Sequence, residues 1–397
     1  MRSLLLQITA LTVMNLKGLP KRFWLSLSTI IAVMLVVVVL LAFLAMRNGF
    51  QHTLASAGSA DVAMIMRAGS QSEVGSVITP DQVRLIDQAP GIAMGPNGKP
   101  LVSAELYLVV DGIKHSSQTK ASLPLRGIGP EGMAVRKGIH IIAGRMFSPG
   151  SNEIVVGKAL LNEFDGLQLG QSVTFGTSRW KVVGVFAADG SVFESEIWAD
   201  LPVVQSFFNR DNIFQTVRAR LVSPSALGEL RGYLDSDPRL KQLEAQSEAA
   251  YFAQQASGTS DLIQKLGWPL AIAMAFGALA GALNTMYSSV AARTTEIATL
   301  RAIGFGGLPA FVSTLVESMV LAALGGALGV TVAFLTLDGL SASTLGGNFT
   351  QVVFSFQLTP ALAAQGVSLA VIVGLAGGIF PSVRAARMPI LAGLYGS

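Results

Sequence analysis

The side chains that could do chemistry in this chain are few and far apart. Its three histidines, His52, His115 and His140, fall on unrelated elements, without the i, i+4 or carboxylate-flanked spacing of a metal site. Cysteine is absent, which excludes a thiolate nucleophile, a thiolate metal site and a disulfide framework. The stretch GPNGKP at residues 95–100 lacks the GxxxxGKS or GxxxxGKT spacing of a phosphate-binding loop. We therefore expect no catalytic residue and no metal or cofactor bound by this chain.

Composition indicates a membrane protein. Of the 397 residues, 51% are hydrophobic and 13% are charged, and the mean hydropathy is +0.54. The formal charge of +4 is small for this length, so nothing indicates a nucleic-acid partner. The informative feature is where Lys and Arg fall relative to the apolar runs.

Four apolar runs are long enough to cross a bilayer. The first, residues 23–46, has no charged residue and would extend roughly 36 Å as a helix. A cleaved signal peptide is the alternative, but the run is too long and no small-x-small site ends it. The other runs occupy residues 266–292, 308–337 and 359–383, and the last begins with a Thr-Pro pair typical of a helix N-terminus.

The basic residues predict the orientation of these spans. They gather in the leader, in the loop after span two and in the C-terminal tail, and none lies between spans three and four. By the positive-inside rule both termini and the loop after span two are cytoplasmic. The residues concerned are Arg2, Lys17, Lys21, Arg22, Arg293, Arg301, Arg384 and Arg387.

The long segment between spans one and two is then extracytoplasmic, and its patterns predict a folded α+β domain. SVTFGTSRWKVVGVF at residues 172–186 has the turn and apolar pattern of a β-hairpin. Further strands are expected at residues 99–110, 137–144 and 152–157. Thr79 as N-cap, Pro80, Gln82 at the third helical position and Gly91 as a stop predict a short capped helix.

The residues that lead into span two are polar and helix-forming. We expect their last part to be a helical stalk continuous with that span, paired with a similar extension after Met46. A flexible linker is the alternative, because Gly258 and Pro269 could each break the helix.

Within the spans Glu317 is the one ionisable residue. Transporters driven by an ion gradient usually place several such residues near the bilayer midplane, which this chain does not. A carboxyl in hydrocarbon costs on the order of 2.5 to 3.5 kcal/mol, so Glu317 must be paired, hydrogen-bonded or neutral. A packing or hinge role, coupling to the cytoplasmic loop and a proton site are the three interpretations.

Small residues suggest close helix packing in three spans. Each of these spans carries a Gly-x-x-x-Gly pair that can bring two backbones together, in a compact bundle or at a dimer seam. Span one, aliphatic and free of Gly, is expected to face lipid or a stalk partner. The pairs are Gly277 and Gly281, Gly325 and Gly329, and Gly374 and Gly378.

The stretch RTTEIATLRAIGFG, residues 293–306, restores charge between spans two and three. Its apolar residues Ile297 and Leu300 recur at helical spacing, Arg293, Glu296 and Arg301 leave polar faces, and the glycines from residue 304 end the helix. The pattern predicts a short amphipathic helix on the cytoplasmic surface. An ordinary loop lying on lipid headgroups is the alternative.

This stretch, with the span that follows, resembles the signature of MacB/FtsX-type permeases, the ABC transporter membrane subunits that include the LolC/LolE lipoprotein extractors. The family pattern R-x-x-E-I-A-x-L-R-A-x-G, then a span with Glu and a Gly-Gly-x-x-Gly run, is matched throughout. Similarity extends to the basic leader, to AGRMFSPGSNEIVVGKALL in the outer domain and to FPSVRAARMPILAGL at the end. The matching positions are Arg293, Glu296, Ile297, Ala298, Leu300, Arg301, Ala302, Gly304, Glu317, Gly325, Gly326 and Gly329.

The resemblance implies a non-catalytic permease of the bacterial inner membrane that is moved by a separate cytoplasmic ABC ATPase. The helix at residues 293–307 would be the coupling helix, with Arg293, Glu296 and Arg301 as polar contacts and Ile297 and Leu300 as packing, flanked by Ala302 and Gly304. ATP and Mg would be bound by two copies of that ATPase. A second permease copy or homologue would complete the assembly, and a periplasmic adaptor or membrane-fusion protein is a further expected partner.

The fold class expected is a membrane protein with four transmembrane α-helices and a large extracytoplasmic α+β domain inserted between spans one and two. The rivals to a transporter subunit are an FtsX-like regulator of an extracytoplasmic cell-wall hydrolase and an ATP-independent receptor or scaffold. The predicted segments are a leader helix at 1–22, span one at 23–46, the domain and stalk at 47–265, span two at 266–292, the coupling helix at 293–307, span three at 308–337, a short extracytoplasmic loop at 338–358, span four at 359–383 and a tail at 384–397.

Overall fold

The computed structural model describes residues 2–346 and 348–390 and divides the chain into two compact units. The helical unit comprises the residues up to 48, residues 262–340 and the residues from 356 onward. The sheet unit comprises residues 49–261 and 341–355. Residues 391–397 of the predicted tail, and the side chains of Arg2 and Lys21 in the leader, lie outside what the structure describes.

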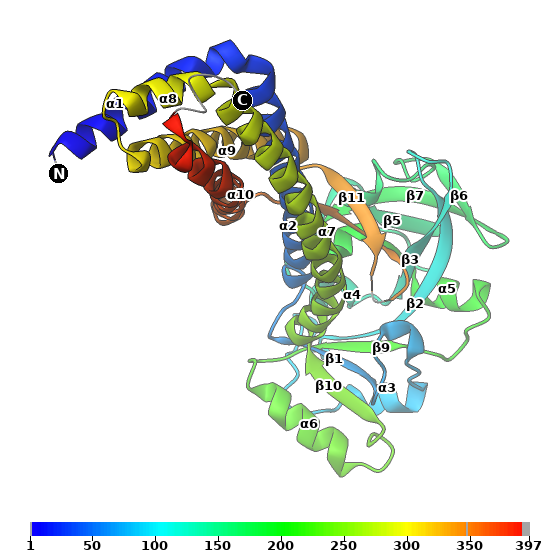
Figure 1. The fold of residues 1–397 in the computed structure, drawn as a ribbon. Coiled ribbons are helices and arrows are strands. Elements are labelled where there is room, and N and C mark those ends of the chain that lie inside the picture. The colour runs from blue at the N-terminus through cyan, green and yellow to red at the C-terminus, as the bar shows by residue number, and fades with distance from the viewer. Residues whose placement is uncertain (1, 347, 391–397) are drawn as a thin grey trace. The chain divides into compact units, whose positions relative to one another are not determined.

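Among the described residues, four helices are long and apolar enough to cross a membrane (Figure 1). Thr359 caps the last of them by accepting a hydrogen bond from the Leu362 amide at 3.3 Å, as its Thr-Pro start predicts. The four are α2 (Phe23–Ala55), α7 (Glu248–Ala292), α9 (Gly307–Leu337) and α10 (Pro360–Arg387), and the shorter helices of this unit are α1 (Arg2–Gly18), η1 (Leu19–Arg22) and α8 (Thr294–Ala302).

Helix α7 runs without a break through both Gly258 and Pro269. The residues before span two are therefore helical and not a flexible linker. Helix α2 likewise continues past Met46 to Ala55.

Span one is expected from its sequence to face lipid or a stalk partner, but one face of α2 supplies buried side chains to the bundle, while Ile31 and Leu35 are 41% and 49% exposed. Val33 and Val37 of α2 are at most 1% exposed. A Cβ added to Gly325 of α9 would lie 2.9 Å from the Val33 Cβ, and one added to Gly329 would lie 2.8 Å from the Val37 Cβ. The valines of span one, which has no glycine between residues 23 and 46, thus pack onto the glycines of α9, a contact that no pattern within α2 alone could reveal.

The sheet unit contains one ten-stranded sheet with strand order β10-β1-β9-β2-β3-β8-β5-β7-β4, and β6 pairs with β7 off this path. The β3–β8 and β5–β7 pairs are parallel and the other pairs are antiparallel. The strands are β1 (Val62–Arg67), β2 (Val102–Ile113), β3 (Lys120–Ile128), β4 (His140–Gly144), β5 (Glu153–Gly157), β6 (Ser172–Phe175), β7 (Ser178–Ala187), β8 (Ile197–Asp200), β9 (Thr216–Arg220) and β10 (Leu243–Ser247).

Short helices connect these strands. Thr79 caps α3 in the predicted capping box, in which its hydroxyl accepts from the Gln82 amide at 3.4 Å and the Gln82 side chain accepts from the Thr79 amide at 3.0 Å. The connecting helices are η2 (Glu73–Gly75), α3 (Pro80–Ile86), α4 (Gly132–Val135), η3 (Lys158–Leu160), η4 (Val192–Ser195), α5 (Leu201–Phe207) and α6 (Ala226–Ser236).

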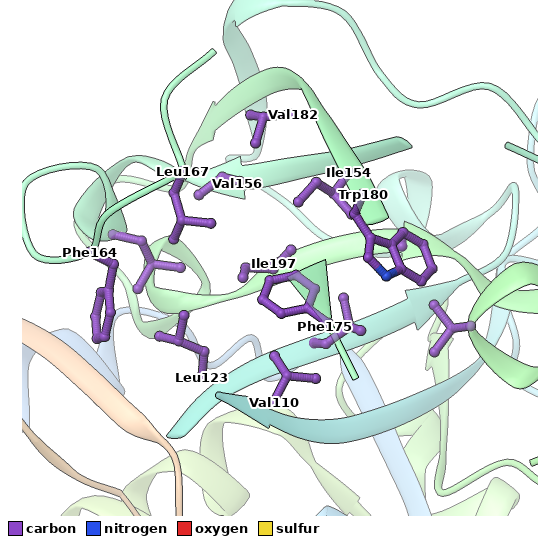
Figure 2. Packing of buried hydrophobic residues seen from close by; sticks show 14 of the residues in the cluster. Val110, Leu123, Ile154, Val156, Phe164, Leu167, Phe175, Trp180, Val182 and Ile197 are labelled. Carbon is purple, nitrogen blue, oxygen red and sulfur yellow. The ribbon is translucent and has the colours of Figure 1, made fainter. Parts of the chain in front are cut away.

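The predicted hairpin at residues 172–186 is confirmed as β6 and β7, joined across Gly176 at φ +60°. Its inward side chains Phe175 and Trp180 meet Val110 of β2 and Leu123 of β3 in one buried hydrophobic cluster (Figure 2). A second cluster fills the space between the sheet and helices α3 and α6. The strands expected around β2, β4 and β5 are also present.

The segment at 338–358, expected as a short loop, contains a second hairpin. Strands β11 (Ser341–Leu345) and β12 (Gln351–Ser355) pair antiparallel and belong to the sheet unit. Val353 is 5% exposed within the core of that unit, and its amide donates to Ser195 Oγ at 2.9 Å. Tyr107 and Thr350 share a buried hydrogen bond of 2.9 Å between their hydroxyls. The connection between α9 and α10 is therefore an integral part of the sheet unit.

Candidate functional site

Helix α8 is a short element set apart from α7 by one non-helical residue. Arg293 has φ −110° and ψ 14°, so its backbone leaves the helical region and lets the chain change direction. At the other end Gly304 adopts φ +105°, a conformation open to glycine, and the helix stops before it. The sequence from 294 to 302 is thereby held as a separate helix of nine residues.

Arg293 and Glu317 form a buried ion pair where α7, α8 and α9 meet. The Arg293 guanidinium lies 2.5 Å from the Glu317 carboxylate, and these residues are 5% and 1% exposed. Arg22 of η1 approaches the same carboxylate at 3.4 Å, and the Ser289 hydroxyl contacts both guanidinium groups. Glu317 is thus paired in the apolar environment, as its burial requires. We call Arg22, Ser289, Arg293 and Glu317 the junction cluster.

The other predicted side chains of α8 divide between inner and outer surfaces. The Glu296 side chain is exposed and makes no hydrogen bond or close ion pair within the described part of the chain, although its charge partly opposes the burial that lowers the pKa of Arg22. Ile297 and Leu300 are half-buried, whereas the Arg301 guanidinium donates to the Met388 carbonyl at the C-terminal end of α10. Ala302 and Gly304 are exposed. The predicted residues therefore lie together on one helix, but the three charged ones have different surroundings.

A groove of about 750 Å³ lies beside α8. Met14 and Lys17 of α1 line one part of it, and Glu296, Thr299 and Leu300 line another. Helix α1 is fixed nearby because the Gly306 amide donates to the Gln7 side chain at 3.3 Å. The groove combines apolar surface with exposed charges of both signs, a composition suited to a protein partner.

The three glycine pairs have different neighbours. Gly325 and Gly329 lie against α2, and a Cβ added to Gly374 or Gly378 would come within 2.7 Å of the Ala322 or Ser318 side chain of α9. Around Gly277 and Gly281 of α7 there is open space in the described structure, with no atom within 4 Å of an added Cβ. The α7 pair is thus the one with an unoccupied surface.

The sheet unit holds a second buried charged cluster, which the sequence analysis did not anticipate. Arg126 of β3 makes bidentate contacts of 2.7 and 3.0 Å with Glu73 and of 2.7 Å with Glu196. Arg136 donates twice at 2.7 Å to Glu105. We call the set the sheet cluster; its members, each at most 4% exposed, are Glu73, Glu105, Arg126, Arg136, Glu196, Arg218 and Glu248.

Burial and charge act in opposite directions on these carboxyl groups. Desolvation alone would raise the pKa of Glu105, but three guanidinium groups, foremost that of Arg136, lower it from 4.5 to about 2. The pKa of Glu73 is also lowered, because Arg126 and Arg218 outweigh the desolvation. In turn Glu196, Glu73 and Glu105 raise the pKa of Arg126 against its desolvation. These groups are charged at neutral pH.

A signal for the sheet cluster was present in the sequence. Each of Glu105, Arg126 and Arg218 has an apolar residue directly before it in its strand, in the sequences VSAELYLVV, KASLPLRGI and TVRAR. Charged residues of both signs inside buried strands predict ion pairs, but not which carboxylate meets which guanidinium. The role of Arg22 in the junction cluster was likewise missed, since it was grouped with the leader charges.

The sequence matches two protein families. The MacB-like periplasmic core domain matches residues 26–236, and the FtsX-like permease C-terminal domain matches residues 269–390. Together these matches take in most of α2, the sheet unit up to residue 236 with β11 and β12, the second half of α7 and the helices α8 to α10; residues 237–268 lie between the two matches.

Among known proteins, the pyoverdine export ATP-binding/permease protein PvdT of Pseudomonas entomophila (strain L48) is 25% identical over 396 residues, which cover 91% of this chain and 55% of PvdT. The macrolide export ATP-binding/permease protein MacB of Shewanella sp. (strain W3-18-1) is 22% identical over 353 residues, covering 81% of this chain and 53% of that protein. This chain spans about half the length of these relatives.

Two solved structures are also similar. The periplasmic region of MacB from Actinobacillus actinomycetemcomitans is 15% identical, with a TM-score of 0.37, over 49% of this chain and 92% of that one. The extracellular domain of the ABC-type transporter YknZ from Gram-positive bacteria is 18% identical, with a TM-score of 0.35, over 47% of this chain and 98% of that one.

Proposed function

This chain belongs to the MacB/FtsX family of ABC-transporter-type permeases, and on that premise we propose that it couples ATP hydrolysis by a separate cytoplasmic ATPase to movement of its sheet unit. The sheet unit lies on the extracytoplasmic side; residues 49–261 of it follow span one and lead into span two, residues 341–355 connect spans three and four, and both termini lie in the cytoplasm. The motion serves export or extraction of a substrate. ATP and Mg are held by the ATPase, and this chain supplies the membrane part of the assembly.

The proposal rests on the different surroundings of the charged residues at α8: two bond to neighbouring helices, and one is exposed. Arg293 and Arg301 are engaged inside the helical unit, so α8 is attached to α9 and α10 at its two ends. Glu296 remains exposed beside the groove. A force applied to that exposed surface reaches two membrane helices through buried contacts, which is what a coupling helix requires.

A second copy of the permease, or a homologue, is part of the proposed assembly. The open surface at Gly277 and Gly281 supports this, because close helix association in lipid depends on small residues. A periplasmic adaptor or membrane-fusion protein is a further partner, and the names of the relatives PvdT and MacB point to export as the activity.

The test begins with purification of the full-length chain from its native membrane in mild detergent. We expect an ABC ATPase to co-purify and to hydrolyse ATP. Glu296→Lys should weaken that association at least tenfold while the chain stays folded, because the Glu296 side chain is exposed and makes no hydrogen bond or close ion pair within the described chain. Lys241→Glu, a charge reversal at an exposed site of the sheet unit, is the matched control and should change nothing.

Two outcomes would contradict the proposal. If the Glu296→Lys variant bound the ATPase as well as the wild type does, α8 would not be the docking helix. If a protease in the cytoplasm could cleave the sheet unit, the proposed orientation of the chain in the membrane would be wrong. A cell-wall or division defect on deletion, in place of failed substrate handling, would instead favour the FtsX-like regulator.

A further inference from the structure

Two strand edges in the sheet unit are left open toward one groove. β2 pairs with β9 through residues 102–105 and with β3 along its other edge through residues 106–113. From residue 106 to the end of β2, no strand of the described residues pairs with the edge that faces β9 in residues 102–105. β6 pairs with β7 alone, so its second edge is open as well.

The register identifies the main-chain groups on the open edge of β2. The Lys114 amide donates to the Thr119 carbonyl at 2.9 Å, and in an antiparallel ladder every second residue bonds to the same neighbour. The N–H and C=O groups of Val109 and Asp111 therefore point away from β3. At one end of this window the Tyr107 amide donates to the Gln215 side chain at 2.6 Å, and at the other the Asp165 amide donates to the Ile113 carbonyl at 2.9 Å.

Between these ends, no other part of the described chain bonds to the main-chain groups of Val109 and Asp111 on that edge. The same reasoning applies to β6, where the Val182 amide donates to the Gln171 carbonyl at 2.9 Å. The alternating pattern then directs the main-chain groups of Ser172 and Thr174 away from β7.

Both edges line a single groove of about 770 Å³, within the range of sites that bind a ligand. Val109, Asp111, Ser172 and Thr174 all contribute to its wall. The floor beneath is already closed, because Val110 and Phe175 meet in the hydrophobic cluster (Figure 2). The opening is thus a gap in main-chain pairing above a completed core.

We propose that this groove binds an extended segment of an extracytoplasmic partner protein by strand addition to β2 and β6. The open edges offer alternating N–H donors and C=O acceptors at the two-residue repeat of a strand, roughly 6.6 to 6.8 Å, and an extended peptide backbone complements that pattern. The inference rests on the proposed function in one respect: the orientation proposed there decides on which side of the membrane the partner lies.

The side chains of the groove define the chemistry of that segment. Val173 and Phe208 present apolar surface, which suits alternate apolar residues on the inserted strand. Asp111 and Asp165 supply two carboxylates to the wall. Lys120 lies 3.5 Å from Asp111, and Asp165 bonds to the His115 imidazole at 2.7 Å and accepts from the Gln118 side chain at 2.9 Å, so with a neutral imidazole these groups sum to one negative charge. The bound segment should therefore alternate apolar and polar residues and carry Lys or Arg at the end that reaches these carboxylates.

The test uses the full-length chain in detergent and a synthetic peptide, Lys-Val-Thr-Val-Thr-Val-Thr, as the probe. We expect saturable binding by fluorescence anisotropy, with slower hydrogen exchange of the amides of Val109, Asp111, Ser172 and Thr174. The same peptide methylated at alternate main-chain nitrogens should bind at least tenfold more weakly, because it cannot complete the ladder.

Proline variants separate main-chain recognition from side-chain contact. Val109→Pro and Thr174→Pro each remove an N–H that faces the groove while leaving the ladders to β3 and β7 intact, and each should weaken binding at least tenfold. Val109→Ala and Thr174→Ala keep the N–H and should bind within threefold of wild type. Hydrogen exchange of the β3 amides checks that every variant is folded.

Equal binding of the methylated and unmethylated peptides would overturn the proposal, as would proline variants that bind as well as the alanine variants. The chain could also dimerise through this groove. If Val109→Pro abolished that dimer and the peptide did not compete with it, the occupant would be a second copy, contrary to the proposal. Peptide binding needs neither the ATPase nor a membrane orientation, so its failure is distinguishable from failure of the coupling function.

Discussion

Replacing Glu317 by Gln removes the anion of the junction cluster and leaves two guanidinium groups without it. Arg293 is 5% exposed, and the side chain of Arg22 is 15% exposed, so neither can recover full hydration in place. Removing one partner of a buried ion pair costs about 3 to 5 kcal/mol. We expect the lower end, about 3 kcal/mol, because the Gln carbonyl remains an acceptor and the Ser289 hydroxyl still contacts both arginines.

Amide hydrogen exchange of α8 in the detergent-solubilised chain measures this cost. Since Arg293 is the residue that precedes α8, loss of its partner should favour local opening of residues 294–302 by about 3 kcal/mol, roughly a hundredfold in exchange rate. Ser313→Ala is the matched control. Ser313 is buried in α9, as Glu317 is, but its hydroxyl donates only to the Ala310 carbonyl of α9. It should change α8 exchange by less than threefold.

A double-mutant cycle then tests the pair itself. Arg293→Gln in the Glu317→Gln background removes the more buried of the two unpaired charges and allows an amide–amide hydrogen bond, so the double variant should be more stable than the sum of the single effects by at least about 1 kcal/mol. Strict additivity, or Glu317→Gln exchange within threefold of wild type, would refute the view that the ion pair holds α8 to α9.

Three further predictions concern the rest of the molecule. Arg126→Met should destabilise the sheet unit by about 3 to 5 kcal/mol in thermal unfolding, whereas Arg239→Ala, at an exposed pair, should stay within about 1 kcal/mol. Glu105, whose pKa is lowered from 4.5 to about 2, should contribute stability above pH 4.5 that is lost as pH falls toward 2, measured by urea unfolding against pH. Gly277→Leu should weaken self-association in crosslinking without unfolding the chain, and Gly325→Leu should unfold the bundle; equal effects would contradict this.

Local signals were sufficient for the elements that local interactions determine. The capping box at Thr79 and Gln82 involves groups three residues apart, and the β6–β7 turn depends on one glycine at positive φ. Hydropathy alone located the four long helices, because length and apolar content are properties of each segment by itself.

The hairpin of β11 and β12 shows what local signals miss. QVVFS of β12 is an apolar run, but SASTL of β11 is small and polar and has no strand-like alternation. The pairing is stabilised by distant residues, since Ser195 bonds to Val353 and Glu73 donates its amide to Asn348 at 3.1 Å. A sequence pattern cannot report contacts that depend on where the rest of the sheet lies.

The two buried clusters share a helix, which bears on how α7 could transmit force. Its first residue, Glu248, accepts a hydrogen bond of 3.0 Å from Arg218 of the sheet cluster. Near its other end, Ser289 belongs to the junction cluster. One end is thus held by a buried ion pair and the other by contacts between the Ser289 hydroxyl and two guanidinium groups; breaking such polar contacts costs more than sliding apolar side chains past one another. This matters if α7 acts as a lever. If either end were weakly attached, the contacts there would break first, and a displacement of one end would not reach the other. In the proposed function, these polar contacts therefore act by keeping both ends of α7 attached while the ATPase cycles.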